Sequence, residues 1–286
     1  MSSINTNINA LTASNALSRN GKAQQDTMQQ LSTGKRINRA SDDAAGLAIR
    51  ETMTAQITGL NTAIKNANDG ISLLQTADGA LSETSSLLQR MRELAVLAVN
   101  DTYSTTQKTA MSTEYVALGA QIDQIATNTQ FNGTAVLSGA GGTYGGVGSF
   151  LFQIGANTAQ TMAVAIVSQT LAQYLLTGTT ITTAANATAQ IALIDTAIGT
   201  LNTQRSTIGA AVNRLSHALD NLSNVAANAT DSRSKIEDTD YATATSDLAR
   251  QQIIAQAATA ILAQANQQPQ ISQRPPRTLK LKRPGP

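Results

Sequence analysis

The feature that most constrains the fold is an apolar repeat with steps of three and four residues, which runs for six heptads from Met53 to Ala95. A second repeat alternates in the same way over fourteen positions, from Ile191 to Ile236. Heptads sustained over such lengths indicate long helices that pack as coiled coils. The sequence therefore predicts a mainly α fold, a long coiled-coil-like helical rod with antiparallel helices from the N- and C-terminal halves.

Polar residues interrupt the first repeat at Asp78, Ser85 and Arg92, where a second apolar stripe from Leu87 to Ala98 begins. A helix with two apolar faces contacts more than one neighbour. The stripe from Met111 to Ile125 predicts a further, shorter helix. Ser41 followed by two aspartates is typical of a helix N-terminus, so we expect Ser41 to cap the first long helix.

The middle of the chain changes character. Seven of the sixteen residues from Gly133 to Gly148 are glycine, which excludes a helix interior. Two apolar segments with strand composition follow, 149–154 and 162–167, and the turn-forming residues Gly155-Ala156-Asn157 lie between them. This pattern predicts a small β-hairpin near residues 149–167.

Each end of the chain carries a short apolar stripe that it cannot bury alone. The residues concerned are Ile4, Ile8 and Leu11 near the N-terminus, and Leu248, Ile254, Ile261 and Leu262 near the C-terminus. Isolated short helices are marginal in water. We therefore expect the two terminal helices to pair with each other or with other copies of the chain, as in self-assembly.

Composition excludes several classes of function. The chain has no cysteine and a single histidine, His217, which we expect on a helix surface. Cysteine-based zinc sites, HExxH metalloprotease sites and cysteine nucleophiles are thereby excluded. We expect no catalytic, cofactor-binding or metal-binding residues and no enzyme activity. No membrane-spanning run and no cleavable signal peptide are expected either.

The net charge of +2 depends on the C-terminal segment. All five prolines lie from Pro269 onward, and five cations lie from Arg274 to Arg283. Without those cations, 15 basic residues remain against 18 acidic ones, a net charge of −3. We therefore expect no nucleic-acid partner. The basic, Pro-rich tail 270–286 is interpreted as a solvated extension, with a frameshifted or artificial end and a basic arm for acidic polymers as alternatives.

Several long motifs resemble one family. They are INTNIN (4–9), LSTGKRINRASDDAAGLAI (31–49), NDGISLLQTADGAL (68–81), QRMRELAV (89–96), FNG (131–133), FQIGANT (152–158), RLSHALDNLS (214–223), IEDTDY (236–241) and QANQQP (264–269). In this order they resemble bacterial flagellin over roughly residues 1–139, 149–167 and 190–269. The resemblance is to a short form without a sizeable outer variable domain. It implies a structural subunit of the extracellular flagellar filament, the helical propeller of swimming bacteria.

The resemblance also implies a division of the chain. The N-terminal inner-tube helix and linker occupy 1–42, and the N-terminal part of the rod domain occupies 43–176. A short variable loop (177–189), the C-terminal part of the rod domain (190–238), the C-terminal inner-tube helix (239–269) and the tail (270–286) follow. The seven apolar residues of the two end stripes then become inner-tube assembly residues. The terminal helices are expected to pair on assembly.

Partners follow from the same resemblance. They are other copies of the chain, the flagellar cap and hook-associated proteins, and an export chaperone that shields the C-terminal helix, with export through the flagellar type III apparatus. The motif 89–96 also matches the segment read by the host Toll-like receptor that senses flagellin. Subunit packing, and recognition by that receptor, are accordingly expected at Gln89, Arg90, Glu93, Leu94 and Glu114.

Two other functions stay open on the sequence. A hook–filament junction protein shares similar ends. A flagellin homologue held at the cell surface as a polysaccharide-binding adhesin is favoured only by the basic tail and the Gly-rich segment.

Overall fold

The computed structural model describes residues 7–139 and 148–272. Ile4, residues 140–147 of the Gly-rich segment and residues 273–286 of the tail lie outside the described residues. The chain divides into two compact units. We call residues 54–230 the core unit, and residues up to 53 together with those from 231 the end unit.

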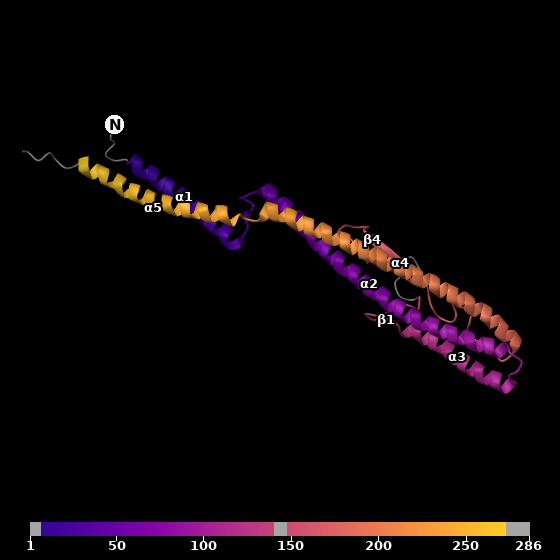
Figure 1. The fold of residues 1–286 in the computed structure, drawn as a ribbon. Coiled ribbons are helices and arrows are strands. Elements are labelled where there is room, and N and C mark those ends of the chain that lie inside the picture. The colour runs from indigo at the N-terminus through magenta and orange to yellow at the C-terminus, as the bar shows by residue number, and fades with distance from the viewer. Residues whose placement is uncertain (1–6, 140–147, 273–286) are drawn as a thin grey trace, which may run out of the picture. The chain divides into compact units, whose positions relative to one another are not determined.

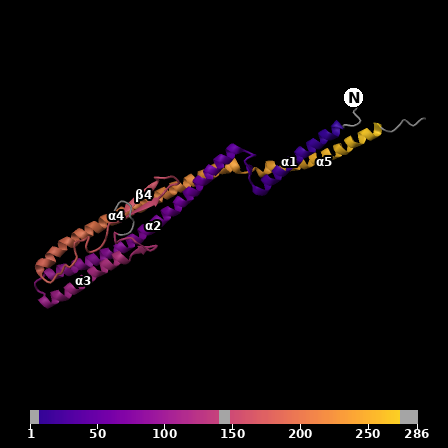
Figure 2. The ribbon, with the colours of Figure 1, turned by 180° about the vertical axis from the view of Figure 1, so that it is seen from behind.

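Three helices build the core unit: α2 (Ala44–Val99) from residue 54, α3 (Thr105–Asn128), and α4 (Ala184–Glu237) up to residue 230. α2 and α4 run antiparallel, because Asp78 of α2 contacts Arg205 of α4 while the later Arg92 contacts the earlier Asp195 (Figure 1). Figure 2, which views the molecule from behind, shows α3 lying beside the C-terminal part of α2. The predicted mainly α fold with antiparallel helices from the two halves is confirmed. α4 begins at Ala184, so residues 184–189 of the expected variable loop are helical.

Both apolar repeats face the core of this unit. Leu74, Leu81 and Leu88 of α2 and Leu201 and Leu215 of α4 are completely buried. The second stripe is also buried, since Met91, Leu94 and Ala98 pack in the same cluster, with Tyr115 and Ile122 of α3. His217 is exposed, as expected.

The polar interruptions in the two repeats have a structural reason. Arg205 Nε donates to Asp78 Oδ1 at 2.8 Å, and Arg92 Nε donates to Asp195 Oδ1 at 2.6 Å. Each pair joins a polar residue in one repeat to a partner on the facing helix. The pairs are about half-exposed, so each contributes little to stability, but they match only one alignment of the two helices.

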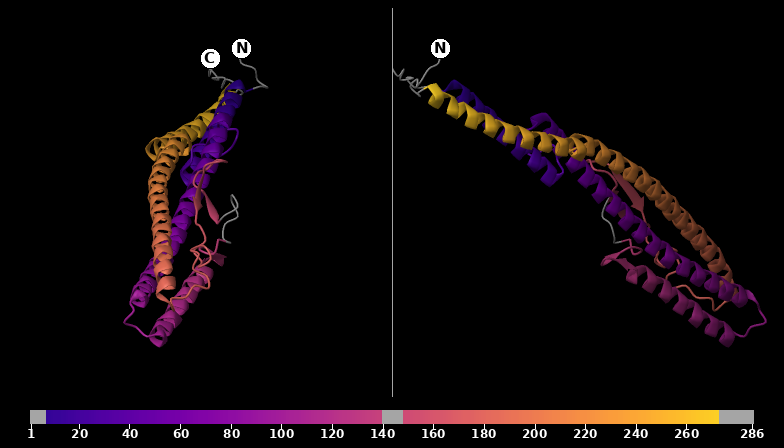
Figure 3. Two further views of the ribbon diagram at one scale, coloured as in Figure 1. Left: turned by 90° about the vertical axis from the view of Figure 1, so that its right-hand side faces the viewer. Right: turned by 60° about the vertical axis from the view of Figure 1, so that its left-hand side comes forward.

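The predicted β-hairpin is present. β3 (Ser149–Gln153) pairs antiparallel with β4 (Thr161–Ala165), and it lies against α2 and α4 (Figure 3). Side-chain amides hold its edges: Asn66 Nδ2 donates to Gln153 O at 3.2 Å, and Gln204 Nε2 donates to Ala165 O at 3.1 Å. Close packing against helical glycines adds to this, since a Cβ on Gly70 would meet the Phe152 ring at 3.0 Å.

A second, smaller hairpin follows α3. β1 (Gln130–Phe131) and β2 (Thr134–Ala135) are joined by Asn132 and Gly133, both at positive φ (50° and 77°). An Asn-Gly pair with two positive φ angles is the preferred two-residue hairpin turn. These paired strands were not predicted from the sequence, because two-residue strands carry no period.

Residues 166–183 are irregular and are held by buried polar contacts. Leu171 N donates to Asp123 Oδ1 at 2.8 Å, and Ile181 N donates to Ser112 Oγ at 3.3 Å. Tyr115 and Tyr174 are both buried, and burial raises the pKa of both phenols. The hydrogen bonds from Leu171 N and Ile181 N satisfy backbone groups that would otherwise be costly to bury.

The end unit contains a helix pair, α1 (Ile8–Thr33) and α5 (Tyr241–Ser272), with the first turns of α2 and the last turns of α4. α1 ends at Gly34, whose φ of +71° is the left-handed conformation that glycine adopts at no steric cost. The expectation that Ser41 caps α2 is wrong. The helix begins at Ala44, and Asp43 Oδ1 accepts the Gly46 N–H at 2.9 Å.

Candidate assembly surfaces

The α1–α5 pair leaves several large apolar side chains exposed on its two helices. Ile8 is 64% exposed, Leu11 59%, Ile254 46% and Ile261 58%, and the neighbouring Ile253 is 66% exposed. We call these five residues the open face. They include four of the seven residues expected in inner-tube assembly. Of the others, Leu248 and Leu262 are half-buried, and Ile4 lies outside the described residues.

The seam between α1 and α5 consists mostly of small and polar side chains, of which Thr27, Ala244 and Ala265 are buried and the rest half-buried. It follows a repeat of three and four residues in both helices: Ala10, Ala13, Leu17, Asn20, Gln24, Thr27 and Leu31 on α1, and Ala244, Leu248, Gln251, Ala255, Ala258, Leu262 and Ala265 on α5. Asn20 Nδ2 donates to Gln251 O at 2.8 Å, and Asn7 Nδ2 donates to Ala265 O at 2.7 Å. The pair is antiparallel and close, but it buries little apolar area.

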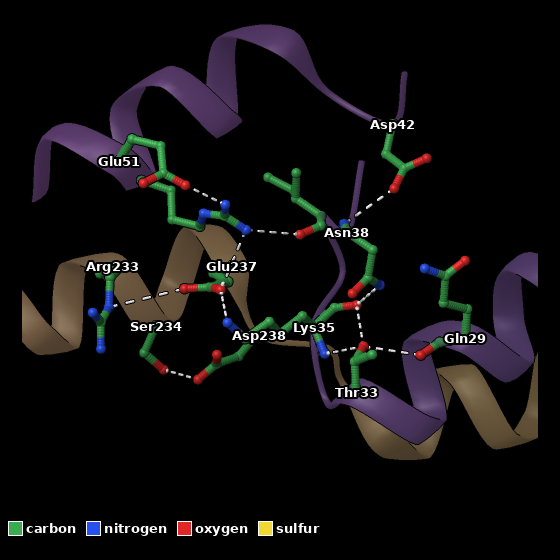
Figure 4. A network of polar contacts seen from close by, with 12 residues as sticks. Gln29, Thr33, Lys35, Asn38, Asp42, Glu51, Arg233, Ser234, Glu237 and Asp238 are labelled. Atoms are coloured by element: carbon green, nitrogen blue, oxygen red, sulfur yellow. Dashed lines mark hydrogen bonds and ion pairs between the residues drawn. The ribbon is translucent and has the colours of Figure 1, made fainter. Parts of the chain in front are cut away.

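A cluster of charged residues lies where the segment that follows α1 meets the last turn of α4 (Figure 4). Glu237, at the end of α4, is 5% exposed. Its Oε1 lies 2.5 Å from Lys35 Nζ and 3.5 Å from Arg50 Nη1, and Arg233 Nε lies 3.9 Å from Oε2. Glu237 Oε1 is compensated by positive charge rather than by an aligned hydrogen bond.

Backbone hydrogen bonds join the same two segments. Arg36 N donates to Glu237 O at 2.6 Å, and Thr239 N donates to Gly34 O at 3.0 Å, on either side of an antiparallel bridge between Lys35 and Asp238. Tyr241 adds a third point, since its hydroxyl donates to Leu31 O at 2.8 Å. We call the contacts of residues 31–36 and 50 with residues 233–241 the clasp.

Two aspartates stabilise the turns next to the clasp. The backbone N–H groups of Arg39 and Asn38 donate to Asp42 Oδ2 at 2.9 and 3.1 Å and lower the pKa of that carboxyl. Asp240 precedes α5, and its pKa is lowered first by the Thr243 hydroxyl and then by the backbone N–H groups of Ala242 and Thr243. Asp240 caps the first turn of α5, and Asp42 holds the turn at residues 38–39; these hydrogen bonds favour the ionised form of both carboxylates.

The five residues expected at the subunit or receptor surface divide into two groups. Arg90 forms ion pairs with Glu114, at 2.9 Å, and Glu93, at 3.1 Å; Glu114 is the main cause of its raised pKa. Gln89, like these three, is exposed, so α2 and α3 present one polar surface. Leu94 is different: it is 2% exposed and packs in the core, so it supports this surface from beneath.

The described residues contain no group of three His, Cys, Asp or Glu side chains arranged to hold a metal ion. Within the same residues, no helix is long and apolar enough to cross a membrane.

The clasp was not predicted from the sequence. Its residues lie about 200 positions apart, and nothing local to Glu237 indicates that it is buried. The one available signal was a glutamate in the last turn of a long helix, where the helix dipole disfavours an acid unless a cation compensates it.

Comparisons with known proteins agree on one family. The model of the bacterial flagellin N-terminal helical region matches residues 4–141, and that of the bacterial flagellin C-terminal helical region matches residues 191–271. Flagellin of Bacillus subtilis (strain 168) is 42% identical, over 93% of this chain and 97% of the relative. The flagellar filament 31.3 kDa core protein of Treponema maltophilum is 40% identical, over 92% of this chain and 96% of the relative.

Among solved structures, Bacillus cereus flagellin is 37% identical with a TM-score of 0.48, covering 55% of this chain and 88% of that one. Two family models matched in order, and curated relatives above 40% identity along nearly their whole length, show that this chain belongs to the bacterial flagellin family.

Proposed function

We propose that this chain is the structural subunit of an extracellular bacterial flagellar filament, a homopolymer that acts as the propeller for swimming. The observation that carries the proposal is the open face, five large apolar side chains exposed on the two helices that join the chain's ends. A polymer of identical copies covers such a face with itself. The names of the relatives, flagellin and filament core protein, agree with this role.

The two units have different tasks in this proposal. The α1–α5 pair, within the expected segments 1–42 and 239–269, forms the inner tube, and the core unit forms the layer around it. The core unit buries most of its large apolar residues in one cluster, although Leu175, Val116 and Val96 remain exposed. No residue is given a catalytic role. The proposal treats the chain as structural only.

Other partners follow from the same surfaces. An export chaperone that covers Ile253, Ile254 and Ile261 would prevent premature polymerisation before type III export. The cap and hook-associated proteins would contact the open face only at the two filament ends, where no further copy covers it. The polar surface of Gln89, Arg90, Glu93 and Glu114 is proposed as a contact between copies, and for the host Toll-like receptor.

The test is seeded elongation. Purified protein is incubated with short filament seeds, and the lengths are measured by negative-stain electron microscopy. The proposal expects long tubular filaments. A version ending after Gln268 serves as the matched control for the basic tail: elongation by that version alone would locate the failure in the tail. If neither form elongates, the junction-protein and surface-binder alternatives replace this proposal.

A further inference from the structure

The apolar residues of the α1–α5 seam do not by themselves favour the alignment that the structure shows. In the register set by the contacts of Asn7 with Ala265 and of Tyr241 with Leu31, Leu17 lies opposite Ala255. A slip of one heptad would place Leu17 opposite Leu262, and Leu31 opposite Leu248. Facing leucines bury more apolar area than a leucine facing an alanine. Something else must hold the observed register.

We infer that the clasp is the register-determining element for the pairing of α1 with α5. The inference deepens the proposed function and rests on it, because the paired ends are the part that assembles. Lys35, Arg36 and Tyr241 are its central residues, with Glu237 as the buried anion.

The geometry explains how the clasp excludes the slip. Hydrogen bonds at Gly34 and Arg36 fix the end of α1 against residues 237–239, next to the start of α5. A one-heptad slip moves α1 by about 10 Å along α5. It would place Tyr241 opposite residue 38, beyond the end of α1 at Thr33, and its hydroxyl would lose Leu31 O.

Charge adds to this selection. Glu237 is buried and meets three cations, from residue 35, from α2 and from α4. Withdrawal of Lys35 in a slipped register would remove the nearest of them from a buried carboxylate. Unpaired buried charge is strongly disfavoured, whereas the matched state is specific to one alignment.

The connecting segment permits the slip once the clasp is broken. Residues 34–43 join α1 to α2, and ten residues can extend to about 30 Å, well beyond the displacement required. The polar seam does not forbid the slip either. Asn20 donates to a backbone carbonyl, which every turn of α5 supplies. Gln251 Nε2 donates to Thr27 Oγ1 at 3.1 Å, and the slip would place Thr27 opposite residue 252, beside Gln251, so this contact does not oppose it.

The experiment uses the full chain, whose lack of cysteine leaves introduced thiols as the only ones. One reporter carries Leu17→Cys with Ala255→Cys, for the observed register. The other carries Leu17→Cys with Leu262→Cys, for the slipped one. Each is combined with Glu237→Gln plus Tyr241→Phe, which remove the anion and the hydroxyl at nearly constant volume. Asp231→Asn is the control, because it removes an exposed ion pair to Lys235 on the same helix end.

Intramolecular disulfides are quantified under mild oxidation, with and without seeds, and helicity is checked by circular dichroism. We expect the 17–255 disulfide to dominate in the parent and the control. In the clasp variant the ratio of 17–255 to 17–262 disulfides should fall about tenfold or more. An unchanged ratio overturns the inference. So does loss of both disulfides in the clasp variant, or their absence from the parent in both states. Elongation is scored separately, so a protein that never elongates counts against the proposed function while the ratio still reports the register.

Discussion

The core unit and the end unit both contain helical repeats of three and four residues, but different kinds of side chain occupy the repeat positions. In the core unit the repeat positions hold large residues such as Leu81, Leu88 and Leu215, and all three are fully buried. In the end unit the seam is rich in alanine and amides, and large residues such as Ile8 and Ile261 lie outside it, exposed. The core unit thus buries its repeat positions within the chain, although Leu175 and Val116 stay exposed. The end unit leaves large apolar side chains outside its seam, and in the proposed filament these contact further copies.

The largest expected effect concerns the open face. Ile254→Asn with Ile261→Asn should stop seeded elongation, because every copy loses the same apolar contacts. The free energy of unfolding of the unassembled chain should change by no more than about 0.5 kcal/mol per residue, since both side chains are already exposed. Filament length and denaturant unfolding are the measurements. Gln252→Asn with Gln264→Asn, exposed on the same helix, is the control. Normal filaments from the isoleucine variant would show that assembly does not need the exposed isoleucines, which contradicts the proposed difference between the two units.

The core unit should respond in the opposite way. Leu81→Ala removes a fully buried side chain and should lower the free energy of unfolding by about 2–5 kcal/mol. Ile8→Ala in the end unit is the matched truncation and should cost less than about 0.5 kcal/mol in the unassembled chain. Urea unfolding measures both. Equal costs at the two positions would show that the end unit also has a completed core.

The surface around Arg90 sharpens the comparison within the core unit. Arg90→Ala breaks ion pairs that are about half-exposed and should cost less than about 1 kcal/mol of stability, while weakening contacts between copies and activation of the receptor. Leu94→Ala should lower the melting temperature through the core. Reporter-cell signalling and seeded elongation are measured beside thermal unfolding. Full signalling and full-length filaments from Arg90→Ala would show that Arg90 contributes neither to contacts between copies nor to receptor activation.

The smallest expected effect is a pH dependence of the end unit. The pKa of Asp240 lies below its ordinary value of 3.8 in the folded chain, so its cap stabilises fully above that value and is lost as the pH falls through the folded pKa. The pKa of Asp42 is also lowered, so its stabilising hydrogen bonds are likewise lost as the pH falls through its folded pKa. Helicity of α5 should therefore decline as the pH falls below the ordinary carboxyl pKa of 3.8. Asp240→Asn replaces the carboxylate with a neutral cap. The circular dichroism of this variant should therefore lack the part of the acid-induced decline that protonation of Asp240 causes. Identical acid curves for the two proteins would contradict the capping role.

The fold was largely predictable, and the reason is periodicity. Both long repeats predicted buried faces, and even the breaks at Asp78 and Arg92 are explained by ion pairs across the two helices. A hairpin near residues 149–167 was predicted from composition and turn residues, and the paired strands β3 and β4 confirm it.

The surfaces were harder to predict because burial depends on which face of a helix meets a partner. Leu94 belongs to a motif that resembles a recognition segment, yet it lies in the core. The stripes at Ile8 and Ile254 predicted pairing of the two ends, but the pair is made through the neighbouring small-residue face. The clasp depends on contacts across about 200 residues, which no local pattern encodes.

Hydrogen exchange read by mass spectrometry tests the central claim most directly. Amide protection is compared between unassembled chain and seeded filaments, helix by helix. We predict that α2 and α4 within residues 54–230 are protected in both states, whereas α1 and α5 exchange rapidly in the unassembled chain and become protected in filaments. Equal protection of α1 and α5 in the two states would contradict the account, because the end unit would then be complete without other copies.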